Sequence, residues 1–357
     1  MSAGSGLTAC NDIQTRLNQI WDSNGAAFYR EETPFLSYLL SAENRNGLQE
    51  QINGKGKLRT VDVIYFPRVL ESSVSADQDR TCTASSTIDD CSASYSMDTS
   101  VNEQIEFTFS YGDLVSYCQD NEMFYAEQVQ RHLDALVRKV ASKSASQAAP
   151  LLGEWNTHAE NIQDSSLSPD WLTFTTRTRL AASGADGYSE YPYTFANISQ
   201  AADMSNFGSV GLFGGLGLSQ TYRQRRMAGG MNDAGMDIGT LVNSEGIGAF
   251  YDKWVASELS EDHDKSWAVG LGSMQLLQFN MYDESFNGRN DDTVKLGIIQ
   301  DPRTGLMADI SFKIDCETVH TVLTATTKVV GLPSDIYQAG DDLSGVTRAA
   351  IVEVDNS

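Results

Sequence analysis

The stretch YGDLVSYCQDNEMFYAEQVQRHLDALVRKVASKSASQAA, residues 111–149, decides how the rest of the chain is arranged. Asp113 is a suitable N-cap for a helix, and Pro150 and Gly153 supply its expected end. At 1.5 Å per residue, about 30 helical residues span roughly 45 Å, which exceeds the diameter of a small domain. We therefore expect a rod that lies across a flat or extended body. Its apolar residues recur at the helical steps of three and four; they are Phe124, Val129, Leu133, Leu136, Val137 and Val140.

Length and charge limit the classes of function. The chain has 357 residues, 41% of them hydrophobic, which suits two or three domains or one elaborate domain with a real core. Its 48 acidic residues outnumber 25 basic ones, so the net charge is −23. Because an acidic chain repels phosphate groups, tight binding to duplex DNA is disfavoured. No apolar run approaches the roughly 18 residues of a membrane helix, and the first ten residues do not resemble a secretion signal. We expect synthesis in a cytosol and no membrane partner.

The five cysteines and four histidines form no zinc-binding or catalytic motif. Cys82 and Cys91 flank a polar tip that could close as a disulfide loop, but free thiols are favoured in a reducing cytosol. His263 lies in an acidic stretch, 261–264, that could hold a cation, although a solvated turn is favoured. We therefore expect no catalytic residue, no metal and no cofactor, while noting that catalytic sites can assemble from distant residues.

The first 110 residues are expected to form two projecting segments. Residues 1–53 make an arm with two short helices, which cannot bury both helices alone and needs a neighbouring surface. Residues 58–69 have strand composition, and 104–109 alternate apolar and polar side chains. The simplest prediction is a two-stranded arm that goes out along 58–69 and returns along 101–110. Because an isolated two-stranded arm is marginal in water, we expect it to lie on another subunit.

A second mixed α/β unit is expected at 170–292, with a short strand within 174–180. Glycine is dense in 208–217 and 229–248, but no phosphate-loop motif occurs, so close backbone approach or mobile loops are favoured. Residues 237–254 look helical, and Trp267 to Phe279 reads as one buried strand. The stretch 216–226 predicts a basic helix-like patch that could touch an acidic neighbour or nucleic acid, with a subunit contact favoured; its cations are Arg223, Arg225 and Arg226.

The clearest β element is a hairpin near the C-terminal end. Two strands, 294–299 and 307–314, flank the turn that begins at Asp301. Pro302 presets its own φ, and Gly305 accepts the left-handed conformation that closes such a turn. Further strands at 319–330 and 349–354 are expected to close the same sheet.

This order of elements resembles the major capsid proteins of tailed bacteriophages with the HK97 fold. Residues 297–309, GIIQDPRTGLMAD, are similar to the D-P-x-T-G hairpin with a following Asp, here Asp309, that is common in that family. Residues 272–277, GSMQLL, are similar to its G-A-x-Q-L-L strand. The resemblance implies an α+β, HK97-like fold. Its parts would be an N-terminal arm (1–53), an extended loop (54–110), a peripheral domain with a spine helix (111–169), an axial domain (170–292), further peripheral strands (293–330) and a C-terminal segment (331–357).

The resemblance also implies a structural function rather than catalysis. Such a protein assembles as hexamers and pentamers into an icosahedral head, in the host cytoplasm, and remains in the virion around double-stranded DNA. Its partners would be other copies, portal and decoration proteins, and packaged DNA through weak non-specific contact. No long charged helical segment precedes the arm, so a separate scaffolding protein or a processed precursor is expected. The residues expected to matter for assembly are Asp301, Pro302, Gly305, Asp309, Arg223, Arg225 and Arg226.

Two other functions remain open from the sequence. One is a soluble enzyme whose active-site loop is the Gly-rich stretch 208–248. The other is an extracellular, surface-array or adhesion protein whose Ser/Thr-rich stretch 72–99 binds a partner.

Overall fold

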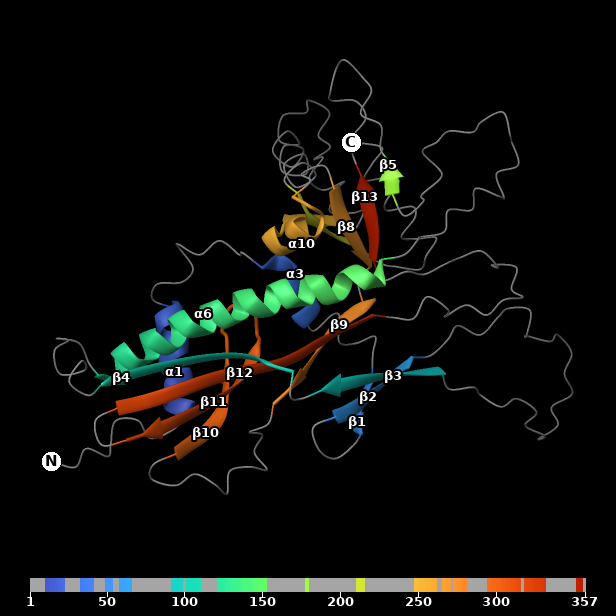
Figure 1. The fold of residues 1–357 in the computed structure, drawn as a ribbon. Coiled ribbons are helices and arrows are strands. Elements are labelled where there is room, and N and C mark those ends of the chain that lie inside the picture. The colour runs from blue at the N-terminus through green and yellow to red at the C-terminus, as the bar shows by residue number, and fades with distance from the viewer. Residues whose placement is uncertain are drawn as a thin grey trace, which may run out of the picture.

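A single helix of 28 residues, α6 (Asn121–Ala148), runs across the middle of the computed structural model (Figure 1). Its apolar stripe is buried, as the period predicts: Val129, Leu133 and Val140 are each 0% exposed. The helix gives way to a short 3₁₀ turn, η3 (Ala149–Leu151), at Pro150. Proline lacks the N–H that a further helical turn needs, so the predicted end is confirmed. At 1.5 Å per residue the helix is about 42 Å long.

The structure describes residues 10–22, 33–41, 49–53, 58–65, 91–98, 101–110, 121–152, 177–179, 210–215, 247–261, 265–270, 272–280, 294–315, 318–331 and 351–355. The expected helix start at 111–120, with Asp113, lies outside these ranges. So do Cys82, His263 and the stretch 72–90.

The main antiparallel sheet packs against α6. Its strands are β4 (Glu103–Ser110), β9 (Met274–Phe279), β10 (Val294–Gln300), β11 (Met307–Ile314) and β12 (Thr318–Gly331). They run in the order β10-β11-β12-β4, and β9 pairs with the far half of β12. The predicted hairpin and the strand after it are therefore confirmed. Every second residue of β12 from Val319 to Ala325 is buried, which places that set on the side of α6.

A second, mixed sheet lies on the other side of α6 in Figure 1. Its strands are β5 (Arg177–Arg179), β6 (Val210–Gly214), β7 (Ile247–Tyr251), β8 (Lys265–Gly270) and β13 (Ile351–Asp355), in the order β5-β13-β8-β6-β7. The helix α10 (Lys253–Glu258) follows β7 and contacts α6. The strand predicted at 349–354 exists, but it joins this sheet rather than the hairpin sheet, so that placement is wrong.

The helix predicted at 237–254 is wrong where the structure describes it. Residues 247–251 form β7, and a helix begins only at Lys253. A short apolar run such as IGAFY fits a buried strand as well as a helix, and pairing with β6 decides for the strand. Close backbone approach, one of the two favoured interpretations of the glycines here, is confirmed at Gly214. A Cβ on Gly214 would lie 2.8 Å from the Cα of Ser266 and 2.9 Å from the carbonyl oxygen of Lys265 on the neighbouring strand.

The single strand predicted at 267–279 is two strands that belong to different sheets. β8 ends at Gly270 and β9 begins at Met274. Between them Gly272 has φ +76°, a left-handed conformation that glycine adopts without strain. The chain thus crosses from one sheet to the other within a few residues.

Three strands before β4 form a separate antiparallel sheet in the order β1-β2-β3: β1 (Gln49–Asn53), β2 (Leu58–Tyr65) and β3 (Cys91–Asp98). The prediction that 58–69 pairs with 101–110 is therefore wrong. β2 pairs with β1 and β3, whereas β4 pairs with β12. The alternation in β4 sets Ile105, Phe107 and Phe109 on one face, and α6 supplies the apolar surface that this face needs.

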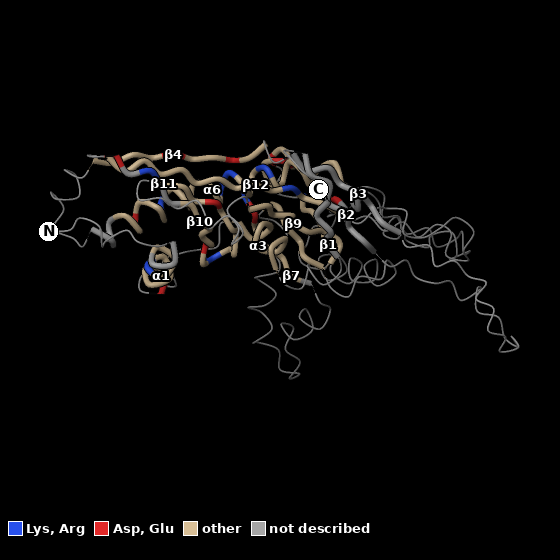
Figure 2. The backbone as a smooth tube through the Cα atoms, turned by 90° about the horizontal axis from the view of Figure 1, so that it is seen from below, with Lys and Arg blue, Asp and Glu red and all other residues tan. Residues whose placement is uncertain are grey.

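Two N-terminal helices, α1 (Cys10–Ile20) and α3 (Pro34–Leu40), pack onto the body of the same chain. α1 contacts α6 and β10, and α3 contacts β9 and α6. Leu17 and Leu36 are both 0% exposed. The expectation that these helices need a neighbouring surface is confirmed, and this chain supplies it. Figure 2 shows α1 on the side of β10 and β4 on the opposite side; β10 and β4 are the two outer strands of the four-strand order β10-β11-β12-β4. No helix within the described ranges is long and apolar enough to span a bilayer.

Candidate functional site

The turn between β10 and β11 is closed by the side chain of its first residue, Asp301, which is 0% exposed. The Asp301 N–H donates to the carbonyl of Leu306 (2.8 Å), and the Asp301 carbonyl accepts from the N–H of Gly305 (2.9 Å). One carboxylate oxygen, Oδ2, accepts from both the N–H (3.0 Å) and the hydroxyl (2.8 Å) of Thr304. The predicted turn is therefore confirmed, with the aspartate satisfying the backbone of its own turn.

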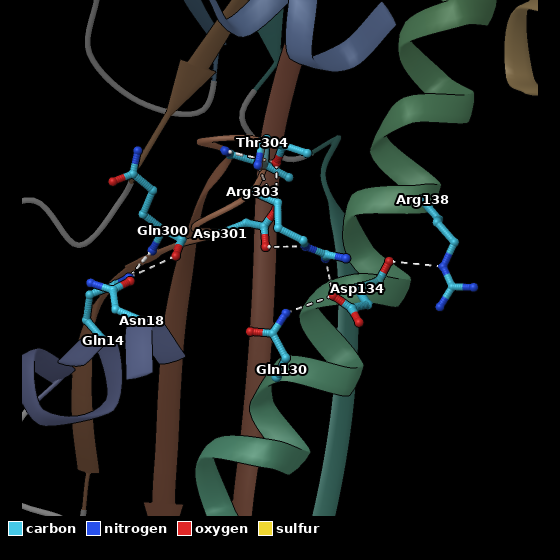
Figure 3. A network of polar contacts seen from close by, with 10 residues as sticks. Gln14, Asn18, Gln130, Asp134, Arg138, Gln300, Asp301, Arg303 and Thr304 are labelled. Carbon is cyan, nitrogen blue, oxygen red and sulfur yellow. Dashed lines mark hydrogen bonds and ion pairs between the residues drawn. The ribbon is translucent and has the colours of Figure 1, made fainter. Parts of the chain in front are cut away.

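Arg303 connects this turn to the long helix (Figure 3). Its Nε donates to Asp301 Oδ1 at 3.2 Å, and its Nη2 pairs with Asp134 of α6. Gln130, one helical turn earlier, donates to the same Asp134 oxygen at 2.8 Å. The guanidinium also lies 5.9 Å from the ring centre of Trp21, which follows α1. One arginine is thus shared by two carboxylates, and three segments far apart in sequence meet at it.

A glutamine joins α1 to the same turn. The side-chain amide of Gln14 donates to the carbonyl of Gln300 (3.0 Å) and accepts from the N–H of Gln300 (2.7 Å). Gln300 ends β10, an outer strand of the main sheet, so Gln14 pairs with backbone groups there much as a neighbouring strand would. Through the polar turn, residues 300–306, the N-terminal arm, the long helix and the hairpin are fixed to one another.

Gly305 has φ +78°, and a Cβ built on it would meet nothing closer than 3.6 Å. The requirement for glycine is therefore conformational rather than steric. We expect Gly305→Ala to lower the free energy of unfolding by about 1–2 kcal/mol, the usual cost of a left-handed alanine. Urea unfolding of the purified chain measures this. Gly305→Asn is the matched control, because asparagine tolerates this conformation better; an equal loss in both variants would mean that lost space, not φ, is responsible.

A second buried aspartate, Asp252, was missed by the sequence reasoning. It is 1% exposed and caps α10, with Oδ1 accepting from the N–H groups of Trp254 (2.9 Å) and Val255 (3.1 Å). Its other oxygen accepts from the N–H of Phe35 at the start of α3 (3.0 Å). The ring of Phe35 packs edge-on against Phe213 of β6, with ring centres 5.4 Å apart. Asp252 therefore joins the N-terminal arm to the second sheet.

The structure brings only part of the predicted site together. Asp301, Pro302 and Gly305 share the polar turn. Asp309 lies further along β11, 4% exposed and opposite Thr324 of β12. The basic patch around Arg223, Arg225 and Arg226 lies outside the described residues. The residues that complete the two sites, and that reasoning missed, are Gln14, Asp134, Asp252 and Arg303.

These groups hold segments in place, and the contacts give none of them the geometry of a nucleophile beside a base. Within the described residues, no group of three or more His, Cys, Asp or Glu could hold a metal ion. His132 of α6 lies with Nδ1 2.7 Å from the carbonyl of Gln128, and its ring stacks on Phe107 at 4.1 Å between centres.

Comparison with known proteins gives matches among solved structures alone. No protein-family model and no curated protein matches the chain. A chain of the cyanophage A-1(L) capsid asymmetric unit shares 14% identity over 93% of this chain and 94% of its own, with a TM-score of 0.45. A chain of the cyanophage P-SCSP1u capsid shares 9% identity over 86% and 85%, with a TM-score of 0.40. A chain of the satellite phage P4 procapsid, which includes the size determination (Sid) protein, shares 10% over 86% and 89%, with a TM-score of 0.31. The chain is thus similar over most of its length to proteins of phage capsids, the class that its sequence resembles.

Proposed function

We propose that the chain is the major capsid protein of a tailed bacteriophage, of the HK97 type. Copies assemble as hexamers and pentamers into an icosahedral head around double-stranded DNA. One observation carries the proposal: among the described strands, β1, β2 and β3 pair only with one another, while the strand that follows them, β4, returns to the body. A body with a long helix and a separate projecting sheet is suited to reach across a neighbouring copy.

The projecting sheet has a physical need for such a neighbour. Its strands have 5, 8 and 8 residues, and no described helix contacts them extensively enough to cover either face of this sheet. A small sheet gains independent stability only when one face is covered. A second copy can supply that cover, and a head-to-tail contact of this kind closes into rings and shells when it is repeated.

The body supplies the rigidity that a shell requires. α1 and α3 are pinned by Gln14 and Asp252, and the polar turn is pinned to α6 by Arg303. In this proposal α6, β10, β11 and β12 belong to the peripheral domain (111–169 and 293–330), while β4 joins the main sheet from the extended loop and β9 joins it from the axial domain (170–292). The second sheet belongs to the axial domain, with β13 contributed from the segment 331–357. The N-terminal arm is 1–53, the extended loop is 54–110, and the patch around Arg225 makes a subunit contact.

The proposed partners follow from this assignment. They are other copies of the chain, a separate scaffolding protein, a portal and decoration proteins, with assembly in the host cytoplasm and a final place in the virion. The role is structural and not enzymatic. Size-exclusion chromatography with negative-stain electron microscopy tests it: shells, hexamers, pentamers or sheets are expected. A compact monomer that binds a defined small molecule would favour an enzyme instead, and a flat array would favour a surface-layer protein.

Deleting residues 72–100 is expected to abolish shell formation while leaving α6 folded. The deletion removes β3, so β2 loses one of its two partners and the projecting sheet cannot form. Electron microscopy detects assembled particles, and circular dichroism at 222 nm measures the helix content. The control replaces 72–90 alone with a Gly/Ser linker of equal length, which keeps β3. Normal particles from the full deletion would contradict the role given to the projecting sheet.

A further inference from the structure

The solvent side of α6 carries a row of cations in a chain that is otherwise strongly acidic. Arg131, Arg138 and Lys139 are exposed, whereas the residues on the opposite side of the helix are buried. Arg131 and Arg138 are seven residues apart, so they share one side of the helix with roughly 10 Å between them along its axis. We call these three residues the basic face of α6.

The clustering is not a by-product of a general excess of positive charge, because the net charge of the chain is −23. Among the lysines and arginines whose exposure the structure describes, the exposed ones are Arg131, Arg138, Lys139, Lys253 and Lys313, so three of these five lie on the basic face.

One described carboxylate lies on that side of the helix: Glu127, which is half-buried and precedes Arg131 by four residues, so the three cations outnumber it. The next carboxylate of α6, Asp134, is 9% exposed and turned toward Arg303. The Nε of Arg138 donates a hydrogen bond to the backbone carbonyl of Asp134 (3.2 Å), and the guanidinium of Arg138 points away from the polar turn in Figure 3.

The residues between the cations indicate what kind of partner fits. Gln128, Ala135 and Ser142 complete this side of the helix. None is a large apolar residue, so the surface lacks the aromatic or aliphatic anchors on which protein–protein interfaces depend. Small and polar neighbours instead leave the guanidinium groups accessible. The planar fork of a guanidinium group matches the oxygens of a phosphate.

We infer that the basic face of α6 binds the phosphate backbone of double-stranded DNA, weakly and without sequence preference. This inference rests on the proposed function, in which the chain encloses DNA, and it identifies the surface that faces it. Binding through two or three cations per copy releases few counterions from the DNA, so each copy binds the duplex weakly. At physiological salt the screening length is about 8 Å. The basic face therefore acts only on a duplex that is almost in contact, and the net charge of each copy disfavours tighter adhesion.

The test is fluorescence anisotropy of a labelled 20-base-pair duplex of mixed sequence with the purified, unassembled chain, over a series of salt concentrations. The double variant R131Q/K139Q is compared with K253Q/K313Q, which removes the same charge from exposed residues elsewhere. In R131Q/K139Q the slope of log K against log salt is expected to fall by about 1.8, two phosphate contacts at roughly 0.9 each. The control variant is expected to keep the wild-type slope.

Equal weakening in both variants, or no salt-dependent binding by the wild-type chain, would overturn the inference. Electron microscopy of the same variants separates the remaining outcomes. Loss of shells in R131Q/K139Q but not in K253Q/K313Q would mean that the basic face is a subunit contact, which also overturns it. A wild-type chain that forms no shells would reject the proposed function, while the duplex titration would still report on the basic face.

Discussion

Asp301→Ala is expected to lower the free energy of unfolding by about 3 kcal/mol. The buried carboxylate accepts from the Thr304 N–H, the Thr304 hydroxyl and Arg303 Nε. Alanine leaves the Thr304 N–H without its acceptor and removes the Asp301 carboxylate from Arg303, whose pair with Asp134 remains. Urea unfolding, followed by circular dichroism, measures the change. Hydrogen exchange should also quicken in α1, because the Gln14 contact depends on the same turn.

Two variants define what the Asp301 result means. Asp301→Asn keeps an oxygen for the Thr304 N–H but loses the charge that pairs with Arg303, so about half the loss is expected. Asp315→Ala removes an aspartate that is 60% exposed and pairs with Lys313 at 3.5 Å, and it should cost under about 0.5 kcal/mol. If Asp315→Ala cost as much as Asp301→Ala, removal of any acid from this hairpin would account for the effect.

Asp252→Ala is expected to cost about 3 kcal/mol as well, through a different set of contacts. It removes the cap of α10, worth about 1 kcal/mol in typical helices, and leaves the buried N–H of Phe35 without an acceptor, at about 1–3 kcal/mol. Because that N–H begins α3, the helix should loosen from the second sheet. Hydrogen exchange of residues 35–40 then rises more than that of α6.

Asp252→Asn separates the two roles of this aspartate. The amide oxygen can still accept from Trp254 and Val255, whereas the amide nitrogen cannot accept from Phe35. We expect α10 to keep its protection and α3 to lose it. Unchanged protection of both helices in Asp252→Asn would show that Asp252 acts as a cap alone.

The elements that could be predicted from sequence are those with a local signal. The helical period of α6 repeats over many turns, and Asp301, Pro302 and Gly305 stand in an order that predicts a closed turn. The partners of the strands could not be predicted, because alternation in β4 states only that one face is buried. It does not state whether β2 or β12 supplies the neighbouring strand. The run IGAFY, which directly precedes Asp252, fits the helical period as well as a strand. A helix predicted to run through residue 252 leaves no N-cap there, so the role of Asp252 as the N-cap of α10 was missed.

The candidate site divides in the same way. Asp301 and Gly305 follow from turn chemistry, so they could be named in advance. Asp134 could not, because its partner Arg303 is 169 residues away and an amphipathic pattern identifies only which positions border the buried stripe. Gln14 was equally hidden, since its hydrogen bonds are made to backbone groups of Gln300, 286 residues later, and those groups have no sequence signature.

The pairing of β4 with β12 also has a consequence for the chain during its synthesis. β4 ends at Ser110 and its partner begins at Thr318, so 318 − 110 = 208 residues separate them. At about 5–20 residues per second, a ribosome takes roughly 10–40 s to deliver the partner. During that interval the edge of β4 has no partner strand, and the apolar stripe of α6 lacks the β12 part of the sheet that covers it. Chaperone demand should therefore peak while the middle of the chain is translated, and should fall once β12 has emerged.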